Sequence, residues 1–125
     1  MTNQVVNEEI DLSICIGGDC SIVVGTISGL MTKWDADKIH VIYLDGDVDS
    51  IAQNPKDCIG SAGMGLWMLL NHSDYWGKSQ LTSEQITVIG NKEKPSTDLG
   101  ICYYSLENVY KQGMNHILKK VLSAI

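Results

Sequence analysis

The sequence predicts an α/β domain whose sheet is mostly parallel. Short and nearly continuous apolar runs alternate along the chain with longer stretches of helical character. This alternation is typical of a parallel sheet that helices cover on both faces, which gives three layers in the order α-β-α. The 125 residues, 44 % of them hydrophobic, supply one modest core, so we expect a single domain over residues 1–125.

Two strands and one helix are expected in the first half of the chain. Residues 12–16 form an apolar run that stops at two glycines, as a buried strand before a turn does. Residues 21–30 are small and apolar and suit a helix, which either Asp19 or Ser21 could cap. Residues 39–44 are rich in β-branched side chains and stop abruptly at an acidic segment, which predicts the clearest strand of the chain.

The second half continues the alternation. Residues 62–71 predict a helix despite two glycines, which we attribute to close packing against a neighbouring element. Residues 86–90 and 101–104 predict two more strands. A last helix is expected after Ser105, a residue type that favours helix starts. Its apolar face is expected to consist of Val109, Met114, Ile117, Leu118 and Val121.

The composition argues against several classes of partner. The formal net charge of −6, with only nine Lys and Arg residues, argues against nucleic-acid binding and against attraction to anionic membranes. The acidic start of the chain lacks the pattern of a signal peptide, and no apolar run is long enough to cross a bilayer. The four cysteines contain no Cys-x-x-Cys pair and are expected to be reduced and buried. We therefore expect a cytoplasmic protein.

Two clusters, 17–21 and 45–49, carry the candidate chemistry. They read Gly-Gly-Asp-Cys-Ser and Asp-Gly-Asp-Val-Asp, and each follows a predicted strand. Parallel strands form sites at their carboxyl ends, so the two clusters are expected to converge. Asp45, Asp47 and Asp49 would repel one another in an apolar setting unless a divalent cation balanced their charges. A solvated acidic turn is the alternative without a metal.

Two known metal motifs compete for the second cluster. An EF-hand loop that began at Asp45 would need Gly at its sixth position and Glu at its twelfth, but these are Ser50 and Lys56, so the motif fails. A haloacid-dehalogenase-type phosphatase also begins with an apolar strand and an Asp-x-Asp-x-Val stretch, which residues 42–48 fit. Such a phosphatase needs a later acidic pair for its Mg²⁺ site, and the chain offers no convincing one.

The two clusters together resemble the ureohydrolase family, which includes arginases, agmatinases and formiminoglutamases. The family motif Gly-Gly-Asp-His-Ser, followed by a small apolar helix, is similar to residues 17–30. The motif Asp-Ala-His-x-Asp at the end of an apolar strand is similar to residues 41–49. The later stretches 86–93 and 99–109 and the closing helix also resemble arginases. The resemblance thus covers nearly the whole chain after its first ten residues.

The resemblance implies a function and a set of metal ligands. The family has a three-layer α-β-α fold with two Mn²⁺ ions, which activate a hydroxide that attacks a guanidinium carbon. Carried over by position, Asp45 would bridge both metals, Asp49 and Cys20 would bind one of them, and Asp47 would bind the other. No residue is assigned a catalytic role beyond the metal site. The substrate would be a small guanidino or amidino compound.

Several family residues are replaced or absent. Cys20 and Asp47 stand where the family usually has His, and Ala62 stands where arginases have a proton-shuttling His. A later Ser-Phe-Asp-x-Asp motif, which supplies two more ligands, does not occur, so the chain is expected to be a truncated or degenerate part of the family domain. We expect weak metal binding and little urea release by the chain alone. The alternatives are an inactive metal-binding or regulatory partner, bound to a second copy or a full-length relative, and the Mg²⁺-dependent phosphatase.

Overall fold

The chain divides into two compact units, each made of two separate segments. The computed structural model describes residues 16, 18–51, 61–71, 80–92 and 99–125. The helical unit takes its residues from 1–39 and 49–81, and the sheet unit consists of residues 40–48 and 82–125. The chain passes from one unit to the other within the second acidic cluster, between Val48 and Asp49.

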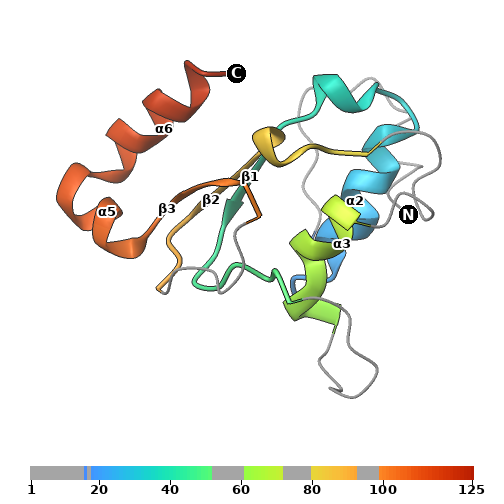
Figure 1. Ribbon diagram of the computed structural model, residues 1–125, viewed down its shortest axis with the longest axis horizontal. Coiled ribbons are helices and arrows are strands. Elements are labelled where there is room, and N and C mark those ends of the chain that lie inside the picture. Colours follow the sequence, from blue (N-terminus) through green and yellow to red (C-terminus); the bar gives the residue numbers. More distant parts are fainter. Residues whose placement is uncertain (1–15, 17, 52–60, 72–79, 93–98) are drawn as a thin grey trace. The chain divides into compact units, whose positions relative to one another are not determined.

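Among its described residues, the helical unit contains two α-helices, α2 (Ile22–Met31) and α3 (Gly65–Asn71), which pack side by side (Figure 1). The expected helix at 21–30 is therefore confirmed. Ser21 occupies its N-cap position but makes no side-chain capping bond. The helix expected at 62–71 begins instead with a 3₁₀ turn, η2 (Ser61–Met64). A second 3₁₀ turn, η1 (Ala36–Lys38), follows α2.

In the described part of the sheet unit, three parallel strands form a sheet in the order β1-β2-β3 (Figure 1). They are β1 (Val41–Leu44), β2 (Ile86–Ile89) and β3 (Cys102–Tyr104), and they confirm three of the expected strands and the parallel α/β class. A 3₁₀ turn, η3 (Ser83–Gln85), leads into β2. The fourth expected strand, at 12–16, lies almost entirely outside the described residues. In the part of the chain that the structure describes, none of the helices is long and apolar enough to cross a membrane.

One face of the sheet packs against the last helix of the chain. Ile89 of β2, Ile117 and Val121 are buried together. The opposite face is equally apolar at β2, where Ile86 and Val88 have no exposed surface. A central strand that is apolar on both faces is the pattern of a sheet that needs a layer on each side. The partly buried residues around this cluster are Ile42, Tyr104, Val109 and Leu118.

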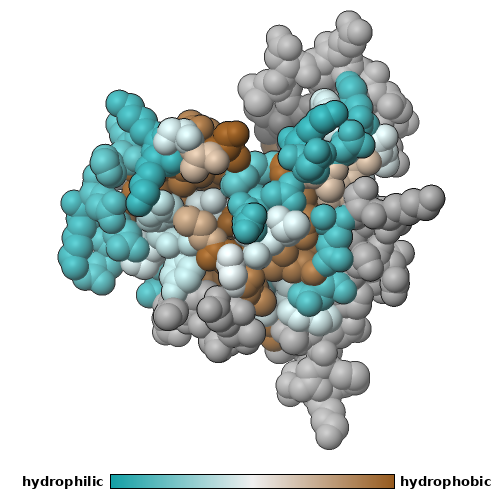
Figure 2. Space-filling view, turned by 45° about the horizontal axis from the view of Figure 1, so that its top comes forward, coloured by the Kyte–Doolittle hydropathy of each residue, from teal (hydrophilic) through white to brown (hydrophobic). Residues whose placement is uncertain are grey.

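The sequence predicted a single closing helix, and this prediction is wrong because the structure has two helices there. They are α5 (Leu106–Gln112) and α6 (Met114–Leu122), and Gly113 separates them with a φ of 81° and a ψ of 140°. This conformation suits glycine and stops the helical hydrogen-bond ladder. The expected apolar face is also only partly buried, since Met114 is exposed. Figure 2 shows hydrophilic residues over much of the α5 and α6 region, in its left-hand part.

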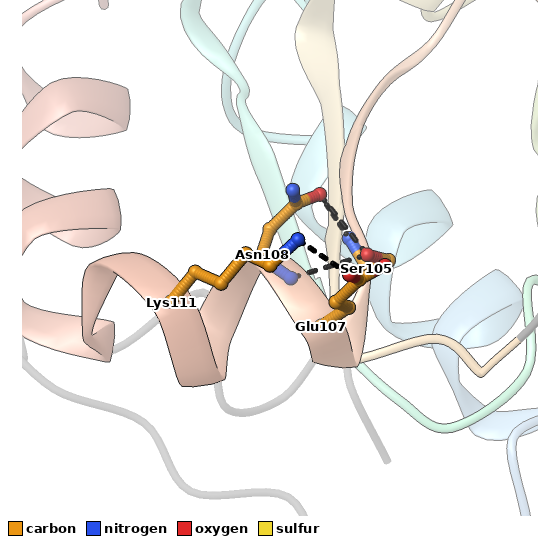
Figure 3. A network of polar contacts seen from close by, with 4 residues as sticks. All are labelled: Ser105, Glu107, Asn108 and Lys111. Atoms are coloured by element: carbon orange, nitrogen blue, oxygen red, sulfur yellow. Dashed lines mark hydrogen bonds and ion pairs between the residues drawn. The ribbon is translucent and has the colours of Figure 1, made fainter.

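A capping box closes the start of α5 at Ser105, the residue that the sequence indicated as a helix start. The Ser105 hydroxyl accepts a hydrogen bond from the Asn108 backbone N–H at 3.2 Å, and the Ser105 N–H donates to Asn108 Oδ1 at 2.9 Å (Figure 3). Glu107 and Lys111 form an exposed ion pair one helical turn apart (Figure 3). Both features are local, so they stabilise α5 without fixing its place on the sheet.

Candidate metal site

Asp49 is held in place by the helix that follows it in the helical unit. Its backbone has a φ of 49°, a left-handed conformation that Asp tolerates better than most residues. Its carbonyl oxygen accepts hydrogen bonds from the backbone N–H groups of Leu66 at 3.0 Å and Trp67 at 3.4 Å. These are N–H groups of the first turn of α3, which have no partner within the helix. The fixed main chain of Asp49 therefore directs its half-buried side chain.

Cys20 lies in the turn that starts α2. Its carbonyl oxygen accepts a hydrogen bond from the Val23 N–H at 3.2 Å, and its side chain is half-buried. Neither Cys20 nor Cys102 forms a disulfide, as expected. Cys102 is exposed, however, so the expectation that the thiols are buried is wrong at that position.

Gly65, the first residue of α3, allows the close approach of these two segments. A Cβ atom at Gly65 would lie 3.1 Å from Val23 Cγ1, 3.6 Å from the Cys20 carbonyl oxygen and 4.0 Å from Asp49 Cβ. The close packing that the sequence suggested for the glycines of this helix is thus confirmed at Gly65. A side chain at this position would be in tight contact with Val23, which would have to move by a few tenths of an ångström.

Two atoms that can ligate a metal, one from Cys20 and one from Asp49, lie close together in the helical unit. The sulfur of Cys20 and a carboxylate oxygen of Asp49 lie within 4.8 Å of each other. Two donors that share one Zn²⁺ ion are separated by at most the sum of their bonds to it, about 4.5 Å. The pair is thus close to the separation that a shared cation requires.

Asp45 and Asp47 belong to the sheet unit, where they form the turn after β1. The Asp45 N–H donates to the Ile89 carbonyl oxygen at 3.1 Å, which continues the pairing of β1 with β2. Asp45 Oδ1 accepts from the Asp47 N–H at 3.1 Å. Gly90 (φ 103°) lies beside this turn, and a Cβ there would approach the Asp45 carbonyl oxygen to 3.3 Å. The Asp47 side chain is exposed.

The sequence did not single out Lys92, which also contacts this turn. The Lys92 N–H donates to the Gly46 carbonyl oxygen at 2.9 Å, and its Cε lies 3.9 Å from the place of a Cβ at Gly46. The preceding residue, Asn91, is fully buried, and its carbonyl oxygen accepts from the Leu106 N–H at 2.9 Å. The only signal in the sequence was the position of these residues directly after a strand and a glycine.

Asp19 stabilises the turn before α2. Its carboxylate accepts hydrogen bonds from the Ser21 hydroxyl and from the Ser21 N–H, and both bonds hold the pKa of Asp19 below its ordinary value of 3.8. The carboxylate is fully exposed. Of the two residues proposed to cap α2, Asp19 is thus the one whose side chain binds the turn.

The candidate ligands, three aspartates and one cysteine, are all able to bind a divalent cation. The cysteine, however, is not a ligand that suits Mn²⁺. Carboxylates such as those of Asp45, Asp47 and Asp49 are ligands that Mn²⁺ prefers. A cysteine sulfur is a soft ligand, whereas Mn²⁺ is bound best by oxygen and imidazole. The donor set therefore disagrees with manganese at Cys20.

Comparison with known proteins gives a consistent match. A sequence model of the arginase family matches residues 2–125. The arginase of Saccharomyces cerevisiae is 26 % identical over 125 residues, which make up 90 % of this chain and 38 % of the yeast protein. The arginase of Bacillus subtilis is 27 % identical over 134 residues, covering 96 % of this chain and 44 % of that protein. The chain thus spans less than half the length of these relatives.

Solved structures agree with this match at the level of the fold. A crystal structure of Bacillus subtilis arginase superimposes with a TM-score of 0.79 and 21 % identity, over 98 % of this chain and 46 % of the other. Entamoeba histolytica arginase, in complex with L-ornithine, gives a TM-score of 0.78 and 22 % identity, over 98 % and 47 % of the two chains. Since the family match extends over almost all of its residues, the chain belongs to the arginase family.

Proposed function

We propose that this chain carries the divalent-cation site of a ureohydrolase-type hydrolase, which acts on C–N bonds of small guanidino or amidino compounds. The observation that carries the proposal is the Cys20–Asp49 pair, whose ligating atoms lie within 4.8 Å. The two residues come from the two separate clusters of the sequence.

Asp45 and Asp47 complete the proposed ligand set on the strength of the family motif and of their place in the chain. They precede Asp49 by four and two residues, so the main chain keeps them near it. When bound, a divalent cation supplies a nucleophile derived from water at neutral pH. The residues of this chain would hold and orient the cation: the Asp45 side chain is braced by the Asp47 N–H, and the Asp49 main chain by α3.

Metal binding by matched variants tests this proposal. Asp49→Asn keeps a residue that tolerates the left-handed backbone but removes the carboxylate charge. Asp37→Asn, an exposed position in η1 of the same unit, serves as the control. We expect calorimetric titration with Zn²⁺ or Mn²⁺ to show an affinity loss of about tenfold or more for Asp49→Asn. Equal affinities in both variants, or no binding by the unaltered chain, would contradict the proposal.

Urea release from arginine or agmatine tests the hydrolase part separately. Cys20, Asp47 and Ala62 replace residues that the family usually has as His. This observation favours a second candidate function, a metal-binding partner without hydrolysis that associates with a second copy or a full-length relative. Metal-dependent urea release that is lost in Asp49→Asn supports the hydrolase. Metal binding without urea release, together with co-purification with such a relative, supports the partner.

A further inference from the structure

We infer that Cys20 is a metal ligand and that its sulfur makes the site selective for a thiophilic divalent cation, with Zn²⁺ as the best fit, over Mn²⁺. The inference rests on the proposed function, because it names the cation of the same site. The inference also goes beyond the proposed function, since it depends on a sulfur donor that does not suit Mn²⁺.

The position of the Cys20 sulfur argues for a ligand. A cysteine that merely fills space is among the most completely buried residues of a protein and packs in apolar surroundings. Cys20 is only half-buried, and its sulfur lies within 4.8 Å of an Asp49 carboxylate oxygen. A thiol this close to a carboxylate can share a cation with it, because a cysteine that binds a metal loses its proton and ligates as a thiolate.

The bond lengths of zinc fit this pair. Zn–S bonds are about 2.3 Å long and Zn–O bonds about 2.0–2.2 Å, so the two donors must approach to about 4.5 Å or less. From a separation within 4.8 Å, small rotations of the side chains are sufficient. The main chain on both sides is fixed, at Asp49 by α3 and at Cys20 by the first turn of α2. Gly65 leaves no Cβ between the two segments.

A simple preference for Zn²⁺ would not establish the inference. Sites made of nitrogen, oxygen and sulfur bind Zn²⁺ more tightly than Mn²⁺ as a rule, whichever residues form them. The informative quantity is the change in the Zn²⁺-to-Mn²⁺ affinity ratio when Cys20 is replaced. Cys20→Ser exchanges the sulfur for a hard oxygen of similar size, and Cys20→His introduces the residue that the family usually has. Cys102→Ser, the exposed cysteine of the sheet unit, is the matched control.

The experiment measures the dissociation constants of the full chain for Zn²⁺ and Mn²⁺ by calorimetry under reducing conditions. We expect Cys20→Ser to weaken Zn²⁺ binding by about tenfold or more with little change for Mn²⁺, and Cys102→Ser to change neither. Cys20→His should lower the Zn²⁺-to-Mn²⁺ ratio by strengthening Mn²⁺ binding. In parallel, Co²⁺ added to the unaltered chain should give a sulfur-to-cobalt charge-transfer absorption that Cys102→Ser retains.

The outcomes separate this inference from the proposed function. If Zn²⁺ and Mn²⁺ bind but their ratio does not depend on Cys20, and if no charge-transfer absorption appears, the inference is overturned while the metal site stands. If no divalent cation binds the unaltered chain, both are overturned. If the Cys20 variants fail to fold, the Co²⁺ spectrum of the chain with Cys15, Cys58 and Cys102 all replaced by serine decides between the two results.

Discussion

Different interactions stabilise the sheet unit and the helical unit internally. In the sheet unit, a central strand without exposed apolar surface packs against Ile117 of α6, and the connection between strand and helix is closed by the capping box of Ser105. In the helical unit, the candidate ligands Cys20 and Asp49 are positioned by main-chain hydrogen bonds and by the missing side chain of Gly65.

This difference indicates which residues supply stability and which residues position the candidate ligands Cys20 and Asp49. Buried aliphatic side chains contribute free energy of unfolding in proportion to the apolar surface that they remove from water. The left-handed backbone of Asp49 costs free energy and is retained beside a candidate metal site. Substitutions in the hydrophobic core of the sheet unit should therefore affect stability first, and those around Gly65 should affect metal binding first.

The largest expected effect is the loss of the Ile117 side chain. Ile117 has no exposed surface and packs with Ile89 and Val121. Ile117→Ala should lower the free energy of unfolding by about 2–5 kcal/mol, because it removes buried methyl groups and leaves a cavity. Leu122→Ala, on the same helix but 60 % exposed, should change it by less than about 0.5 kcal/mol. Urea denaturation of both variants measures the effect, and equal losses would show that α6 is not held by this core.

The second effect concerns two helical glycines of the other unit. Gly25→Ala in α2 introduces a Cβ into open space and should raise the free energy of unfolding by about 0.5–1 kcal/mol. Gly65→Ala forces the new Cβ against Val23 and should cost about 1–3 kcal/mol of packing strain. We expect the two variants to differ by at least about 1 kcal/mol, and only Gly65→Ala to weaken Zn²⁺ binding. Equal Zn²⁺ affinities in both variants would show that the packing at Gly65 does not position the metal ligands.

A smaller effect is expected at the start of α5. Ser105→Ala removes the acceptor for the Asn108 N–H and should lower the free energy of unfolding by about 1 kcal/mol. Ser105→Asp keeps an acceptor at the N-cap and serves as the control, which should stay close to the unaltered chain. Metal binding should be unchanged in both, since the hydrogen bonds of the capping box involve Ser105 and Asn108 and none of the candidate ligands. A loss of stability as large in Ser105→Asp as in Ser105→Ala would argue against the cap.

The smallest effect is electrostatic. Lys111 donates a hydrogen bond to Glu107 and, with its charge, lowers the pKa of the carboxyl from its ordinary value of 4.5. A carboxyl whose pKa is lower in the folded state stabilises the fold above its unfolded pKa, and this contribution is lost as the pH falls through the folded pKa. An NMR titration of Glu107 should show this pKa rise toward the ordinary value in Lys111→Met, and also at high salt. An unchanged pKa would mean that the exposed pair does not form in solution.

Much of the fold follows from the sequence because the strands are strongly apolar. The β-branched residues of β1 and β2 and the small residues of α2 predicted their elements within a few residues of the observed ends. The break at Gly113 was missed because an apolar periodicity passes through it, and a single glycine costs a helix only about 1 kcal/mol.

The site could be predicted in part. The two clusters identified Cys20 and Asp49, and the structure brings these two together. The role of Gly65 as the contact point was only partly foreseen, since the sequence suggested close packing but not the partner. Lys92 was missed because its contact with Gly46 depends on the pairing of β1 with β2, which joins segments far apart in the sequence.

X-ray absorption spectroscopy of the full chain, loaded with one equivalent of Zn²⁺, tests most directly whether Cys20 is a metal ligand. We expect one sulfur ligand at about 2.3 Å, with oxygen or nitrogen at about 2.0–2.2 Å as the remaining ligands. The sulfur should remain in Cys102→Ser and disappear in Cys20→Ser. A shell of oxygen and nitrogen alone in the unaltered chain, or a sulfur that persists in Cys20→Ser, would contradict the assignment of Cys20 as a metal ligand.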